Sequence, residues 1–349
     1  MEIGIEQQLN LIDTETIETV LGQANLVQRV SFTDLVYQAI SGELNLSLGG
    51  ILSGGMRLIF AEVVANIALM QGLIFIGVLA ALLKILTESF ESKAVGELGF
   101  YICYILLVTV VFYSFRVAYV TASGMIHTVT NFVQVSIPVV ISLVLMSGNI
   151  TAAYVYNSLF LFAINIFNTI IISIVFPLVI AITTIQIVNF LTENKILGEL
   201  SESVKKGVSL SIKGLAFGFI GILTLQRISA PIINNLAIRT ARITMNVVPV
   251  VGEVLSGALD SVLYFASATK SGVIVAIVLA IIYICIVPVI NLTALIFVYK
   301  FVAAIIQPIS DSRIVKCLDT VGSFTALLLG VCVMVALMFS MALILLVTF

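Results

Sequence analysis

Two arginines and two acids lie within "RTARITMNVVPVVGEVLSGALDS", the stretch from Arg239 to Ser261. If the stretch begins as a helix, Arg239 and Arg242 share one face because they are three positions apart, and Asn246 lies one turn beyond. Charge is otherwise scarce in this chain. We therefore expect these side chains to form a polar cluster that meets water or opposite charges.

Pro249 and Gly252 follow directly and predict a break in that helix. Beyond the break, polar and small residues recur on one side of a second helix, and apolar residues recur on the other. The pattern indicates a broken amphipathic element over residues 231–270. Its polar side carries Glu253, Ser256, Gly257, Asp260, Ser261, Tyr264 and Ser267.

The cost of burying charge leaves two interpretations of this element. A charged side chain at the bilayer centre costs roughly 2.5–3.5 kcal/mol on insertion scales, so the two arginines and two acids do not face lipid. In one interpretation the element is an interfacial turn with ion pairs at the surface. In the other it is re-entrant and its polar side lines an aqueous path, since irregular backbone is tolerated beside a cavity.

Composition defines the class of protein that holds these residues. Of 349 residues, 61% are hydrophobic and 10% are charged, and the mean hydropathy is +1.23. An average soluble domain is roughly half apolar and a quarter charged. The chain is therefore expected to be an all-α integral membrane protein. Its net charge of −2 gives no indication of nucleic-acid binding.

Apolar runs predict seven to eight transmembrane or re-entrant helices. The run from Val117 to Thr192 contains no Asp, Glu, Lys or Arg and has room for three crossings. Its first part, Phe132–Met146, is short and holds Gln134 and Pro138, so it is either a crossing or re-entrant. "SGN" at 147–149 and Pro177 are candidate breaks. The expected spans are Val63–Leu83, Leu98–Phe115, Phe132–Met146, Ala152–Ile171, Ile172–Leu191, Val208–Leu225, Ser271–Val298 and Val321–Phe349.

Residues 1–61 differ from the membrane domain expected over 62–349. They predict short amphipathic helices on or beside the bilayer. Seven acids and two bases occur in this segment, whereas lysines gather in the loop from Lys195 to Lys206. Because Lys and Arg favour the cytoplasmic side, we expect an extracytoplasmic N-terminus.

The sequence does not favour catalysis. It contains no HExxH, GxSxG or P-loop motif. The lone His127 has no nearby acid and makes a weak proton relay, and Arg116 is expected to reach the membrane interface. The four cysteines lack metal-ligand spacing. We expect no enzymatic activity, no cofactor and no metal site.

Several stretches together resemble one family. They are "LLKILTESFES", "VSIPVVISLVLMSGN", "GFIGILTLQRISAP", "ARITMNVVPVVGEVLSGALDSV" and "YKFVAAIIQPISDSRIV". These stretches are similar to the stage III sporulation protein AE family of endospore-forming bacteria. The resemblance implies a polytopic protein of the mother-cell membrane around the forespore. It also implies a secretion or feeding channel between the two cells, formed with other products of the same operon, including a cytoplasmic ATPase and ring-forming single-span proteins.

A channel subunit must help to enclose a path, which one chain of seven or eight helices does poorly. We therefore expect a closed homo-oligomeric ring of identical subunits. Two alternatives remain. The chain is a small-solute permease, since Pro- and Gly-broken helices with buried amides also form transporter sites, or it is a scaffold that anchors its partners.

Overall fold

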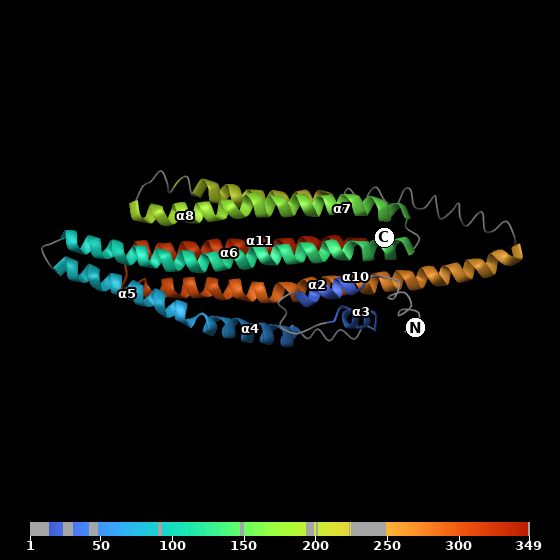
Figure 1. Ribbon diagram of the computed structural model, residues 1–349, viewed down its shortest axis with the longest axis horizontal. Helices are drawn as coiled ribbons and strands as arrows, with labels where there is room; N and C mark the ends of the chain where they lie inside the picture. Colours follow the sequence, from blue (N-terminus) through green and yellow to red (C-terminus); the bar gives the residue numbers. More distant parts are fainter. Residues whose placement is uncertain are drawn as a thin grey trace.

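The computed structural model describes residues 14–23, 31–41, 48–89, 93–146, 150–192, 199, 202–222, 224 and 249–347, and every statement about the structure concerns these residues. Their regular elements are all helices, and most lie side by side along one long axis (Figure 1). The elements are α2 (Thr14–Gln23), α3 (Phe32–Ser41), α4 (Leu48–Ala65), α5 (Ile67–Ser89), α6 (Lys93–Met146), α7 (Ile150–Ile170), the π-helical turn η1 (Ile171–Val175), α8 (Phe176–Thr192), a helix over 202–222, α10 (Pro249–Ile306) and α11 (Ser312–Val347).

Helices α6 and α11 run together through the middle of the bundle, with α7 and α8 on one side and α5 and α10 on the other (Figure 1). Few polar contacts join the layers. The Ser114 and Tyr299 hydroxyls lie 2.5 Å apart between α6 and α10. The Tyr104 hydroxyl donates to the Ile187 carbonyl at 2.8 Å. Most of the remaining interior is apolar, so close packing of large side chains is the main force that holds the layers together.

Helix α6 is continuous through two of the expected spans. Leu98–Phe115 and Phe132–Met146 were expected as separate segments, yet both lie in one 54-residue helix. The hydroxyl residues between the two expected spans do not interrupt it; Thr128, for example, satisfies its hydroxyl by donating to the Gly124 carbonyl of the same helix at 2.9 Å. Pro138 lies inside the helix as well. Of the two alternatives for 132–146, the continuous helix favours a crossing over a re-entrant segment.

The expected boundary between Ile171 and Ile172 is likewise not a break. Helix α7 passes through η1 directly into α8, where the Phe176 N–H bonds the Ile171 carbonyl, five positions earlier. This turn lies immediately before Pro177, which has no N–H to donate. A π-helical turn inserts one residue without ending the helix, so the proline is accommodated within it.

The expected all-α membrane class is confirmed. In the described part of the chain, five helices are long and apolar enough to cross a bilayer. Four of these helical stretches are longer than one bilayer crossing requires. The longest, Glu97–Met146 in α6, has 50 residues and is about 75 Å long, whereas a hydrocarbon core is about 30 Å thick. The other stretches are Ile67–Ile85, Phe160–Phe190, Thr269–Ile306 and Ser312–Leu345. Lipid alone therefore does not cover the full length of this bundle.

The N-terminal helices pack on the bundle. Helix α3 contacts α10, and α2 contacts α6. Gly272 of α10 permits this approach, since a β-carbon at that position would overlap the Ile40 side chain of α3. The domain boundary expected at residues 61 and 62 falls inside α4. The N-terminal segment is thus joined to the membrane bundle both by packing and by a helix.

Candidate functional site

The residues that the sequence singled out lie at or before the beginning of α10. Arg239, Arg242 and Asn246 are outside the described residues. Glu253, Gly257 and Asp260 belong to α10, and their side chains are outside the described part. Whether these groups form a polar cluster remains a prediction.

The structure describes only the second side of the helix break expected at Pro249 and Gly252, because residues 225–248 lie outside the described residues. Pro249 is the first residue of α10, and the helix continues through Gly252 without interruption. Proline favours the first turn of a helix, where its missing N–H has no partner to lose. Glycine inside a helix costs only about 1 kcal/mol relative to alanine. Gly252 therefore does not interrupt α10, and a break between α10 and a preceding helix stays a prediction.

The exposed face of α6 changes character along its length. Its first half, Leu98 to Val120, presents large apolar side chains; Ile102 is 60% exposed and Tyr113 is 72% exposed. The exposed residues of its second half are Gly124, His127, Asn131, Pro138, Ser142 and, in the last turn, Leu145. In α6, no large hydrophobic residue is exposed between Val120 and Leu145. We call these two parts the apolar half and the polar half of the α6 face.

The polar half of the α6 face is joined to α7. The Gln134 amide of α6 donates to the Asn165 side-chain oxygen of α7 at 2.9 Å. Asn165 in turn donates to the Leu161 carbonyl at 2.9 Å. Both amides lie at the surface of the chain. On α7, Asn165 lies between exposed Phe162 and Ile166, so the water-compatible surface is chiefly that of α6, and the amide pair joins it to α7.

The lengths of the two halves fit this division. The apolar half, Leu98–Val120, is about 34 Å long and matches one hydrocarbon core. The polar half, 121–144, adds about 36 Å. Arg116 lies next to the transition, exposed beside Tyr113 in a shallow depression of about 240 Å³. An arginine at that position reaches the headgroup region easily.

A second concentration of polar groups lies where α5 and α10 end and α11 begins. Asp311 connects two cations there: Lys84 Nζ lies 3.2 Å from its Oδ2, and Arg313 Nε lies 3.3 Å from its Oδ1. The Arg313 guanidinium also covers the Phe100 ring at 4.4 Å from the centroid. This cluster ties three helices together in the turn between α10 and α11.

Two opposing effects act on the Asp311 carboxyl. Burial raises its pKa, because a charged group loses water. The Arg313 backbone N–H, the Lys84 ammonium and the Arg313 charge outweigh burial and hold the pKa of Asp311 below its ordinary value of 3.8. Asp311 is therefore ionised at neutral pH and serves as a structural anion.

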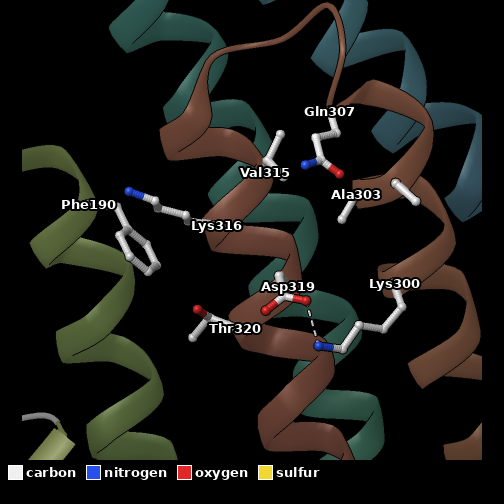
Figure 2. Close-up of a pocket in the computed structure, with 9 residues that line it drawn as sticks. Phe190, Lys300, Ala303, Gln307, Val315, Lys316, Asp319 and Thr320 are labelled. Carbon is white, nitrogen blue, oxygen red and sulfur yellow. Dashed lines mark hydrogen bonds and ion pairs between the residues drawn. The ribbon is translucent and has the colours of Figure 1, made fainter.

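A pocket of about 360 Å³ opens beside this cluster (Figure 2). Lys300 Nζ lies 2.5 Å from Asp319 Oδ1 and donates to Ser323 Oγ at 2.8 Å. Lys316 extends on another side, toward Phe190 of α8 (Figure 2). The pocket thus combines cationic, neutral polar and apolar walls. Its lining residues are Phe190, Lys300, Ala303, Ala304, Gln307, Val315, Lys316, Asp319 and Thr320.

Within the described residues, no group of three or more His, Cys, Asp or Glu side chains is placed to hold a metal ion. The four cysteines are buried and unpaired: Cys103, Cys285, Cys317 and Cys332. Sequence reasoning did not find the Lys84–Asp311 pair, whose partners are 227 positions apart. It also missed the polar half of the α6 face, although the helical spacing of His127, Asn131 and Gln134 carried that signal.

These features define a polytopic helical membrane protein that presents one water-compatible face and one charged end. The chain belongs to the stage III sporulation protein AE family, whose model matches residues 30–349. It is 29% identical over 313 residues to stage III sporulation protein AE of Bacillus subtilis (strain 168), covering 88% of this chain and 78% of that protein. No solved structure matches the chain.

Proposed function

We propose that this sporulation protein is a non-enzymatic membrane subunit of a secretion or feeding channel between mother cell and forespore. It resides in the mother-cell membrane around the forespore. It acts with other products of its operon, including a cytoplasmic ATPase and ring-forming single-span proteins. Membership of the stage III sporulation protein AE family supports the sporulation role.

The polar half of the α6 face is the observation that carries the channel role. His127, Asn131 and Ser142 are exposed on the outside of the single chain, not in its interior. A hydrated face on the outside encloses no path by itself. Further copies of the chain, arranged around an axis with this face inward, complete the lumen.

Helix α11 supplies a surface for contact between copies. The hydrogen bond from Cys332 to the Ala122 carbonyl places α11 beside α6 where the polar half begins. From that level on, α11 exposes apolar residues, of which Leu337 is 63% exposed. An apolar strip beside a hydrated face is unfavourable in water and is suited to a protein partner. The strip is Val333, Leu337, Met341 and Ile344.

The charged end of the bundle supports an orientation of the chain in the membrane with that end in the cytoplasm. Lys84, Arg313 and Lys316 lie where α5 ends and α11 begins, so the positive-inside tendency favours this end as cytoplasmic. Helix α5 runs toward this end. The N-terminal helices α2 and α3, with Glu15, Glu18 and Asp34, then lie on the extracytoplasmic side.

Cysteine labelling tests whether the polar half of the α6 face meets water. The native cysteines are buried, so single substitutions are read against a low background. We expect Asn131→Cys and Ser142→Cys to react with a membrane-impermeant maleimide in membranes. Ile102→Cys and Leu106→Cys, exposed on the same helix in its apolar half, serve as matched controls and should resist.

Equal protection of all four positions would refute the hydrated face. Labelling of Asn131→Cys that changes when a small solute is added would favour the permease alternative over the channel.

A further inference from the structure

The pocket in Figure 2 lies at the edge of the apolar region. Phe190 and Ile306 are the last residues of two candidate spans, and Ser312 is the first residue of a third. The pocket is lined by residues within a few turns of these ends, from α8, α10 and α11 (Figure 2). Such a position corresponds to the depth of phospholipid headgroups. We propose that this pocket binds the headgroup of an acidic phospholipid.

The charges in the pocket favour an anion. Lys300 is held by Asp319 and Ser323, so its charge is largely balanced. Lys316 is exposed, and within the described residues it forms no ion pair. The lining therefore carries one net positive charge, from two lysines and one aspartate. Gln307, in the turn after α10, and Thr320 of α11 add neutral donors.

The apolar wall distinguishes a lipid from a free phosphate ion. Phe190, Ala303 and Val315 line the same pocket as Lys316. A free phosphate gains nothing from these side chains and meets an exposed lysine in water, where attraction is weak. A phospholipid places its phosphate by Lys316 and its glycerol and first methylenes against the apolar wall. The volume of about 360 Å³ falls within the usual range for small-molecule sites, about 300–1,000 Å³.

This site is independent of the proposed channel role, because it needs only the ends of three helices within one chain. It gives the protein a preference for an acidic membrane surface. A lipid held between α8 and the α10–α11 turn also contacts residues of three helix ends at once.

Thermal unfolding of the purified full-length chain in dodecyl maltoside tests the proposal. Four samples receive phosphatidylglycerol, phosphatidylcholine, inorganic phosphate or no addition. We expect phosphatidylglycerol alone to raise the unfolding midpoint, with a dependence on lipid concentration that gives an apparent affinity. Lys316→Gln should weaken this affinity about tenfold, since it removes a charged hydrogen-bond donor. Lys213→Gln removes an exposed lysine outside the pocket and should leave the affinity unchanged.

Three outcomes would overturn the proposal. An equal loss in both variants would mean that charge alone, and not the pocket, attracts the lipid. An unchanged affinity in Lys316→Gln would place the lipid elsewhere. A full shift with inorganic phosphate would replace the lipid by a free phosphate ion.

Discussion

At the scale of residues, the charged side chains at the α10–α11 turn stabilise the packing of the helices. Asp311 is the central residue because it contacts both Lys84 and Arg313 and accepts the Arg313 backbone N–H at 2.9 Å. Asp311→Asn leaves two cations without their anion. We expect a loss of about 1–3 kcal/mol in the free energy of unfolding, measured by denaturation in detergent. Glu202→Gln, at an exposed pair with Lys206, is the control and should change the stability little.

Acid should weaken the same contact. Because the folded-state pKa of Asp311 lies below its ordinary value of 3.8, the contribution of Asp311 is fully present above that value and is lost as pH falls through the folded pKa. The unfolding midpoint of the wild type should therefore fall more than that of Asp311→Asn as the pH falls below about 4. Parallel pH profiles of the two proteins would contradict a stabilising role for the ionised carboxylate.

At the scale of elements, helix packing depends on close approach at a few glycines. Gly272 faces the Ile40 side chain, whereas Gly330 of α11 has open space around its α-carbon. Gly272→Ala should cost about 1–3 kcal/mol of stability through overpacking. Gly330→Ala should be neutral or stabilising, since alanine favours the helix. Adding Ile40→Ala should recover part of the stability lost in Gly272→Ala. If the two substitutions changed the free energy of unfolding additively, Ile40 of α3 would not be in steric contact with position 272.

Sequence reasoning predicted the helical membrane class and several helix ends, but it divided helices that are continuous. Long apolar runs define membrane helices strongly, whereas Pro138 and Pro177 resemble breaks. Helix α6 continues through Pro138, and the η1 turn accommodates Pro177 within the continuous α7–α8 segment. The Lys84–Asp311–Arg313 cluster and the pocket arise only when distant helix ends meet, and no local pattern predicts such meetings.

The whole molecule should insert with its charged end in the cytoplasm. Two exposed positions near opposite ends of α6 give a matched pair, since Glu97 lies near the charged end and Ser142 lies at the far end of the polar half. In spheroplasts of an expression host, Ser142→Cys should react with an impermeant maleimide while Glu97→Cys reacts only after permeabilisation. The reverse pattern would invert the proposed orientation.

The central claim is that the polar half of the α6 face lines a lumen shared by several copies of this chain. Electron-microscopic particle images of the protein purified in detergent test it most directly. The account predicts rings with rotational symmetry, in which residues 121–144 of α6 face the axis and the α11 strip contacts the neighbouring copy. Single bundles, or rings with this part of α6 on the outer rim, would contradict it.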